Sequence, residues 1–384
     1  MDPATWPHSR SSHSAVLARF GADRAGLAGR ALTTGDPPAD AVVEEIHAGG
    51  KPVRDALATG VRDGLAAVAD PPPAVAALLA QAEATPAHVD DDQVKAGCEP
   101  YFSSHPASRT IALSAGALVN TYSSPHIAAV LTGTGRLVEA ADRRLLETGV
   151  WLNAAMLPGG LHRGAPGYVA TLQVRMLHAH VRRHVRAHGF DEAAHGVPVN
   201  QMDLTRTWLD FTLTSYRAEQ AMGFERTPAE IAAVYRYWWH VGHLLGIDPR
   251  IVEGIGSHEA ATRLDALVDA VTGRASAASA ALADASLDSV ARLLQDMVGV
   301  PVRVGRPVLD ALTRRFLGGG AADDLGLPRP ALDVLLPPGI AAVRWRHRRR
   351  RADPDAWRQV HESGMARARG LVANPGGPTE FQTA

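Results

Sequence analysis

The sequence predicts an all-α protein built as a single multi-helix domain. Apolar residues recur at the three- and four-residue spacing of amphipathic helices along most of the 384 residues. No stretch alternates apolar and polar residues as a strand does, and no strand–helix alternation or fixed repeat is visible. A chain of this length can bury a sizeable core, so one large domain with about ten or more helices is expected.

Breakers and caps divide the chain into its expected helices. GDPPAD at 35–40 is a Pro/Asp break, Pro158-Gly159-Gly160 ends another helix, and Asp203 is expected to cap the helix that follows it. Thr227 and Glu230 fit a capping box with proline at the first helical position. The expected helices cover 15–32, 41–47, 51–84 with a break at 71–73, 85–97, 111–122, 125–144, 143–157, 167–187, 204–223, 231–246, 286–299 and 308–319.

The domain boundaries are expected near the two ends of the chain. Residues 1–34 are predicted to be an N-terminal extension and residues 35–369 the main helical domain. The Pro/Gly-rich residues 370–384 are predicted to be a disordered tail. The Ala/Ser-rich run 275–286 is expected to be a mobile surface stretch.

Composition excludes several classes of protein. The net charge of −1 gives no global field that would attract nucleic acid, and lysine occurs only at Lys51 and Lys95. The single cysteine, Cys98, excludes an intramolecular disulfide, a Cys-ligated iron–sulfur cluster, a Cys₂His₂ zinc site and covalent haem attachment. No apolar run is long enough to span a membrane, and no export signal is visible. We therefore expect a cytoplasmic protein, or a secreted one if a leader has been removed.

The stretch VRMLHAHVRRHVR, residues 174–186, combines histidines and arginines on one predicted helix. On a helical wheel of about 100° per residue, His178 shares an inward arc with valines on one side and arginines on the other. The other members of this arc are Thr171, Val174, Arg175, Val181, Arg182 and Val185. Met176, His180 and Arg183 are expected to face outward.

Two interpretations of this arc remain open. A buried imidazole with flanking arginines suits a planar, anionic cofactor. His178 is equally well explained as a core histidine satisfied by a backbone carbonyl, with its arginines paired to carboxylates elsewhere.

A second polar group occurs upstream, in RRLLETGVW. Arg144, Thr148 and Trp151 are spaced i, i+4 and i+7, so they share a helical face, and Glu147 lies beside it. The arrangement is explained either by a tie between helices or by a polar pair that faces a site.

Other motifs give weaker signals. His178 and His180 lie on opposite helix faces, which makes them a poor metal pair. His240 and His243 have no acidic partner at ligand spacing, so packing is favoured. The run VRWRHRRRR at 343–351 predicts a solvated arginine-rich face, with contact to an anionic partner as the alternative.

The ordered set of these motifs resembles the rubber-oxygenase catalytic domain family, which includes the latex-clearing proteins and a fungal oxygenase of mycophenolic acid biosynthesis. The resemblance depends on Arg144-x-x-x-Thr148 and on Arg175-x-x-His178-x-x-x-Arg182, and it runs from about residue 35 to 330. Stretches such as GDPPADAVVEEI, VPVNQMDLTRTWLDF and WWHVGHLLGID add to it in the right order.

The resemblance implies a globin-like core that binds haem b non-covalently, so that 35–369 would be a haem-binding oxygenase domain. His178 would be the iron ligand, and Arg175 and Arg182 would bind the haem propionates or fix the imidazole. Arg144, Glu147 and Thr148 would form the catalytic side of the site. The implied reaction is dioxygen-dependent cleavage of the C=C bonds of poly(cis-1,4-isoprene), giving chains with aldehyde and ketone ends.

The hydrocarbon substrate requires an apolar channel, which side chains of helices 110–157 and 204–223 are expected to line. In the rubber cleavers a lysine that can cap the iron stands where this chain has Glu147. A carboxylate there is expected to act as a distal base or to steer bound oxygen. The expected partners are dioxygen and a polyisoprenoid, with no nucleic acid, and the protein is expected to be a monomer. The alternatives are an oxygenase of a smaller isoprenoid or unsaturated lipid, a haem- or lipid-binding protein without turnover, and a helical nucleic-acid binder that uses 343–351.

Overall fold

The computed structural model describes residues 6–84, 91–133, 141–329 and 336–373. Within these ranges the chain forms helices and no strand, which confirms the all-α prediction. The α-helices are α1 (His13–Leu32), α2 (Pro37–Gly49), α3 (Lys51–Asp63), α4 (Pro73–Glu83), α5 (Asp91–Cys98), α6 (Pro106–Ile111), α7 (Val119–Ser123), α8 (Pro125–Gly133), α9 (Ala141–Met156), α10 (Pro166–Ala187), α11 (Glu192–His195), α12 (Gln201–Leu209), α13 (Ser215–Ala221), α14 (Pro228–Leu244), α15 (Pro249–Val252), α16 (His258–Thr272), α17 (Ala277–Val298), α18 (Val302–Leu317), α19 (Gly319–Asp324), α20 (Leu336–Ala352) and α21 (Pro354–Ala373). Short 3₁₀ turns occur at η2 (Leu65–Ala67) and η3 (Glu99–Ser103), and π-helical turns at η4 (Ala112–Leu118) and η5 (Asp210–Thr214).

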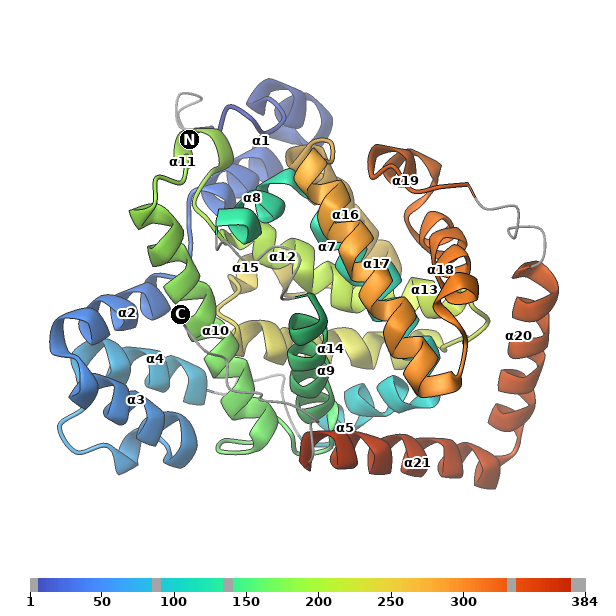
Figure 1. Ribbon diagram of the computed structural model, residues 1–384. Helices are drawn as coiled ribbons and strands as arrows, with labels where there is room; N and C mark the ends of the chain where they lie inside the picture. Colours follow the sequence, from blue (N-terminus) through green and yellow to red (C-terminus); the bar gives the residue numbers. More distant parts are fainter. Residues whose placement is uncertain (1–5, 85–90, 134–140, 330–335, 374–384) are drawn as a thin grey trace.

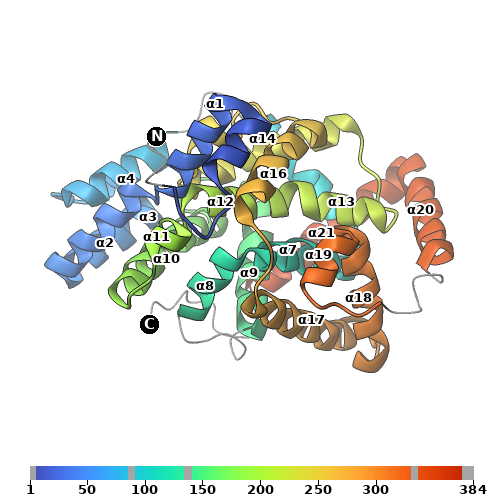
Figure 2. The ribbon, with the colours of Figure 1, turned by 90° about the horizontal axis from the view of Figure 1, so that it is seen from above.

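The helices form one body around a shared core. Helices α2, α3 and α4 lie at one side of the molecule and α20 at the opposite side, with α21 running along the edge between them (Figure 1). Seen from above, α2 and α20 again lie at opposite ends (Figure 2). Helix α10 packs against α9 and α2, and the fully buried Trp208 and Tyr235 lie in the main core. No helix of the described residues is long and apolar enough to cross a membrane.

The expected helix ends are mostly confirmed. Helix α9 ends at Met156, just before the Pro158-Gly159-Gly160 breaker, and the Thr227–Glu230 capping box is present at the start of α14. The predicted cap at Asp203 is wrong. The Asn200 side chain instead accepts the backbone N–H groups of residues 202 and 203. The carboxylate of Asp203 is engaged by Arg10.

Two of the expected helices contain a π-helical turn. The segment predicted at 111–122 runs through η4 into α7, and that predicted at 204–223 runs from α12 through η5 into α13. The carboxylate of Asp210 in η5 accepts hydrogen bonds from Asn120 Nδ2 at 2.7 Å, Thr121 Oγ1 at 2.7 Å and Thr214 Oγ1 at 2.9 Å. Single π turns inside α-helices often occur at functional sites, and here one buried carboxylate joins the two helices that carry them.

The prediction of a mobile surface stretch at 275–286 is wrong. Most of it forms the first half of α17, whose N-cap is Ser276. Leu282 and Ala283 are buried there, because α17 packs against α7, α8 and α18. An Ala/Ser-rich composition was therefore compatible with a tightly packed helix interface.

Both ends of the chain are more integrated than the sequence predicted. Helix α1 packs against α12 and α16, and Arg10 forms a buried ion pair of 3.0 Å with Asp203, so residues of the predicted extension belong to the core. Helix α21 continues to Ala373, four residues into the predicted tail. The remainder of that tail, 374–384, lies outside the described residues.

Candidate functional site

Helix α10 buries the side that carries the arginines of the candidate site. It begins with Pro166 in its first turn, where a missing N–H costs no hydrogen bond. Thr171, Arg175 and Arg182 are all at most 1% exposed, which confirms the arginine side of the predicted arc. Val174, His178 and Val181 of the same arc are only half-buried. Met176, predicted to face outward, is also buried, because α10 is packed between α9, α2 and α14.

His178 lies at the centre of this arc as a half-buried residue. Its Nδ1 is buried and has no hydrogen-bond partner among the described residues. Burial and the positive charge of Arg182 lower the pKa of His178 to about 4, while Asp36 opposes the shift. The imidazole is therefore neutral at pH 7, which is the form that binds a metal ion.

The two arginines are paired with carboxylates of α2 and the residue that caps it. Arg175 Nε donates to Asp36 Oδ2 at 2.6 Å, and its Nη2 donates to Asp36 Oδ1 at 2.9 Å and to Gln81 Oε1 at 2.8 Å. Arg182 donates to Asp40 Oδ1 at 2.7 Å and to the carbonyl of Val199 at 2.9 Å. This is the carboxylate pairing that the sequence had left open as an alternative.

Each arginine nevertheless keeps one buried donor without a partner. Nη1 of Arg175 and Nη2 of Arg182 make no hydrogen bond to the described residues. Leaving a buried donor unsatisfied costs about 1–3 kcal/mol, and more for a charged group. Together with Nδ1 of His178, three unsatisfied nitrogens lie along one side of α10.

Glycines allow other segments to approach these ion pairs closely. A Cβ atom built on Gly246, which has φ +75°, would lie 2.6 Å from Arg175 Nε and would overlap the Asp36 carboxylate. A Cβ on Gly35 would lie 2.8 Å from Arg182 Cδ. The loops before α2 and after α14 therefore cover the two pairs with bare backbone.

Helix α9, which carries the second predicted polar group, packs directly against α10. Trp151 Nε1 donates to Thr171 Oγ1 at 3.0 Å, and Thr171 in turn donates to the carbonyl of Gly167 at 2.6 Å. Thr148 is half-buried one turn before Trp151. The α9–α10 contact thus joins the face predicted for Arg144 and Thr148 to the helix that carries His178.

The two charged residues of α9 have distinct surroundings. The Glu147 side chain is 12% exposed, and its Oε1 accepts from Arg143 Nε at 2.7 Å. Arg144 lies close enough to Tyr122 for its charge to oppose the rise in the Tyr122 pKa that burial causes. Glu147 is therefore held as the carboxylate of an ion pair within α9.

An aromatic cluster adjoins Trp151 and provides an apolar wall. The ring of Phe211 in η5 stacks on Trp238 of α14 at 5.3 Å and meets Trp151 edge-on at 5.5 Å. Trp151 and Trp238 are themselves 6.4 Å apart. These rings come from α9, η5 and α14, of which α9 and η5 belong to the predicted lining segments 110–157 and 204–223 and α14 lies outside them. The apolar channel itself stays a prediction.

Several residues of this arrangement were missed from the sequence. Asp36 and Asp40 are spaced i, i+4, which is about one helical turn. Their partners Arg175 and Arg182 are seven residues and about two turns apart, so spacing alone did not pair them. Asp210 was missed because nothing local marks a buried carboxylate. Burial raises its pKa to about 6 against the opposing charge of Arg206 and three hydrogen bonds.

The remaining motifs behave as packing and surface elements. His243 Nε2 donates to the carbonyl of Gln81 at 2.9 Å, and His240 is buried in α14 with the ring of His243 stacked 6.4 Å away. In the part of the chain that the structure describes, no group of three or more His, Cys, Asp or Glu side chains is placed to hold a metal ion. In the basic run, Arg344 and Arg348 pair with Glu225.

Comparisons with known proteins identify a family and a solved structure to which this chain is similar. A family model described as "ER-bound oxygenase mpaB/B'/Rubber oxygenase, catalytic domain" matches residues 103–352. Among solved structures, the chain is similar to one titled "Structure of Latex Clearing Protein LCP in the closed state", with a TM-score of 0.65, 19% sequence identity and 95% of each chain covered. Comparison with curated protein sequences gives no match. At this identity the structural likeness establishes the fold alone.

Proposed function

We propose that this chain is a haem b-dependent oxygenase of poly(cis-1,4-isoprene). The premise is that the chain belongs to the ER-bound oxygenase mpaB/B' and rubber oxygenase catalytic-domain family. The members of this family are oxygenases, so the chain is an oxidoreductase. The observation that supports the haem is His178, a neutral imidazole with a buried, unsatisfied Nδ1 on the α10 side of the α9–α10 contact.

The residues present fit a haem. A porphyrin supplies four ligands to its iron, so the protein needs to add only one axial imidazole rather than a full ligand cluster. His178 has the protonation state for this role. Nη1 of Arg175 and Nη2 of Arg182 are buried donors that suit an anionic group such as a propionate. The globin-like arrangement implied by the resemblance is part of the same proposal.

The protein's own residues would perform three tasks on the α10 side of the cofactor. Haem supplies the dioxygen chemistry when bound. His178 would hold the iron, and burial, together with the charge of Arg182, keeps its imidazole unprotonated by lowering its pKa. Asp36 and Asp40 fix the arginines and, through them, the position of α10.

The catalytic side is formed by α9 and the aromatic wall. Trp151, Phe211 and Trp238 exclude water and contact the hydrocarbon, which offers no polar group for recognition. Arg144 and Thr148 line the polar part of the site. Oε1 of Glu147 is engaged by Arg143, so a role as distal base would use the other carboxylate oxygen, Oε2.

The overall reaction is balanced by one dioxygen molecule for each cleaved double bond. The C=C bond breaks, and each carbon receives one oxygen atom. Because one carbon of the isoprene double bond bears a methyl group and the other a hydrogen, the products end in a ketone and an aldehyde.

Haem binding is tested by the absorption spectrum of purified and haem-reconstituted protein. We expect a Soret band for wild type and for His184→Ala, an exposed histidine on the same helix, and its loss in His178→Ala. If wild type takes up no haem, the proposal fails.

Turnover is tested separately by oxygen uptake with cis-polyisoprene and detection of carbonyl ends. Uptake with matching aldehyde formation is expected for haem-loaded wild type. Haem binding without oxygen uptake on polyisoprene or on a shorter cis-isoprenoid would identify a binding protein without turnover.

A further inference from the structure

A cavity lies far from α10, between α20, α21 and the η3–α6 segment. Its volume is about 630 Å³. Helix α20 stands at the opposite side of the molecule from α2 and α10 (Figure 1), so this cavity is separate from the candidate oxygenase site. Its lining combines basic and apolar side chains, and none of the described residues that line it is acidic. The basic ones are His105, Arg346, His347, Arg350 and Arg367, and the large apolar ones are Phe224, Val343, Trp357 and Val360.

The arginines of α20 divide between two faces of the helix. On the face toward the body, Arg348 pairs with Glu225 at 2.9 Å and Arg351 with Glu230 at 2.8 Å. These pairs attach the helix to the start of α14 and neutralise that face. Arg346 and Arg350, one turn apart, project from a different face into the cavity.

Three cationic or potentially cationic groups converge at the α6 end of the cavity. His105 Nδ1 accepts the backbone N–H of Ala107 at 3.2 Å, so the ring hydrogen lies on Nε2, which is left to donate to a ligand. Partial desolvation and the positive charges of Arg367 and Arg350 lower the pKa of His105. Both guanidinium groups, which are exposed to solvent, therefore lie near the same ring and line the same cavity, where their charges would attract an anion.

We propose that this cavity is a binding site for a phosphate-bearing amphiphile. The planar guanidinium groups of Arg350 and Arg367 match phosphate oxygens in two-pronged hydrogen bonds, and His105 Nε2 adds a third donor. The hydrocarbon part packs against Phe224, Trp357 and neighbouring aliphatic side chains. The site is independent of the proposed oxygenase function.

The phosphate could belong to a free amphiphile or to a lipid at a surface. A smaller cavity of about 370 Å³ adjoins the first and shares Arg346 and Arg350 with it. Trp345, 58% exposed, lines this smaller cavity, and Arg349 stacks on its ring at 5.1 Å. An exposed tryptophan beside arginines is also found where proteins contact lipid headgroups, so both sources of the phosphate are tested.

Isothermal titration with octyl phosphate tests the site, with inorganic phosphate and 1-octanol as probes of each half alone. We expect octyl phosphate to bind at one per chain, at least about ten-fold tighter than either probe. Arg350→Gln/Arg367→Gln should raise its Kd by about ten-fold or more, as expected for lost charge-assisted hydrogen bonds. Arg303→Gln/Arg315→Gln removes the same charge from exposed positions on α18 and should leave the Kd within about two-fold.

Vesicle sedimentation distinguishes the two sources of the phosphate. Wild type and the double variants are mixed with phosphatidylcholine vesicles that contain or lack phosphatidic acid. Retention that requires phosphatidic acid and both cavity arginines, without octyl phosphate binding, assigns the site to a lipid headgroup, whereas octyl phosphate binding alone assigns it to a free amphiphile. If neither probe binds, if octanol binds as tightly as octyl phosphate, or if the cavity variant matches the α18 control, the proposal is overturned.

Discussion

The ion pairs of Arg175 and Arg182 differ in how far they are removed from water. The Asp36 side chain is 4% exposed and that of Asp40 is 29% exposed. A buried charge that loses its partner keeps its desolvation cost, whereas a partly solvated one recovers hydration from water. The two pairs therefore serve as each other's control.

Asp36→Asn is expected to lower the free energy of unfolding by about 3–5 kcal/mol, because it leaves the buried Arg175 without its counter-charge. Asp40→Asn should cost about 1 kcal/mol, since Arg182 keeps its bond to the Val199 carbonyl. Urea denaturation followed by circular dichroism measures both losses. Equal losses would show that burial does not distinguish the two pairs.

Gly246 has both a left-handed backbone and no room for a Cβ atom. Gly246→Ala is expected to cost about 3 kcal/mol or more, because the methyl group would be forced against Asp36 and Arg175. Gly254 has φ +85° with nothing within 4 Å of its built Cβ, so Gly254→Ala carries only the backbone cost of about 1–2 kcal/mol. Thermal melts of the two variants separate steric clash from backbone strain. A melt for Gly246→Ala no lower than that of the control would rule out the clash.

At this scale the sequence predicted which side of α10 is buried but not what its arginines contact. Helical periodicity is local, so the inward positions of Thr171, Arg175 and Arg182 followed from spacing alone. Asp36 lies 139 positions from Arg175 in the chain, and Asp40 lies 142 positions from Arg182. Such pairings depend on how α2 packs against α10, which no local pattern contains.

At the scale of elements, α17 shows where composition misleads. Alanine and serine in 275–286 suggested mobility, yet small residues also allow helices to approach closely. Leu282 is 2% exposed and clusters with Tyr122 and Ala128.

Leu282→Ala tests this packing directly. We expect a loss of about 2–5 kcal/mol in the free energy of unfolding, as for other buried leucines. Met297→Ala, on the same helix but with a side chain that is 40% exposed, should change it by about 0.5 kcal/mol or less. If the two variants were equally stable in urea, the first half of α17 would be a mobile segment after all.

Many of the helices were predictable, but the long helices α16, α20 and α21 were not among those expected, and neither were the irregularities. Proline and glycine breakers correctly placed the end of α9, and the Thr227–Glu230 box placed the start of α14. Asp210 in η5 bonds to Thr121 of α7, a long-range contact that no local pattern contains. The cap was misplaced for a local reason, because the helix begins at Gln201, three residues earlier than expected, and Asn200 caps it.

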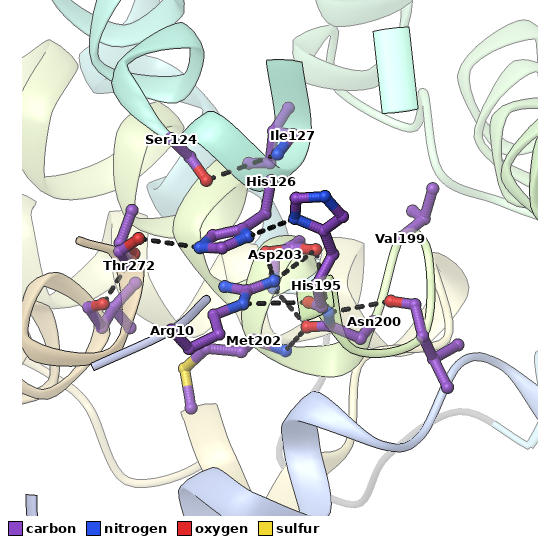
Figure 3. A network of polar contacts seen from close by, with 12 residues as sticks. Arg10, Ser124, His126, Ile127, His195, Val199, Asn200, Met202, Asp203 and Thr272 are labelled. Atoms are coloured by element: carbon purple, nitrogen blue, oxygen red, sulfur yellow. Dashed lines mark hydrogen bonds and ion pairs between the residues drawn. The ribbon is translucent and has the colours of Figure 1, made fainter. Parts of the chain in front are cut away.

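At the scale of the whole molecule, one polar network joins the N-terminal segment to four other parts of the chain. His126 at the start of α8 donates through Nε2 to the carbonyl of Thr272 at the end of α16, and its Nδ1 lies 3.0 Å from Nδ1 of His195 (Figure 3). Arg10 donates to the His195 carbonyl at 3.0 Å and pairs with Asp203 (Figure 3). Since His126 is neutral and carries its hydrogen on Nε2, its Nδ1 accepts the hydrogen of His195 Nδ1.

This network and two other buried histidines make the whole fold acid-sensitive. Burial, together with the charges of Arg10 and His195, lowers the pKa of His126 from 6.5 to about 3. Burial likewise lowers the pKa of His178 and His258 to about 4. Between pH 6.5 and about 4 these rings are protonated in the unfolded chain and neutral in the folded one, so unfolding takes up protons and stability falls as the pH falls.

We expect the free energy of unfolding, measured by urea titration, to fall from pH 6.5 to 4.5, because the three histidines outweigh Asp210. The raised pKa of Asp210, about 6, makes the folded state take up a proton in this window and so opposes part of the loss. Each buried histidine contributes a slope of up to about 1.4 kcal/mol per pH unit in this window. His126→Gln removes one of these protons, so its slope should be flatter by about that amount even though its stability at pH 7 is lower. His258→Gln should flatten the slope in the same way from a different part of the fold. A slope unchanged in both variants would place the acid sensitivity in the carboxylates and remove the buried histidines from its cause.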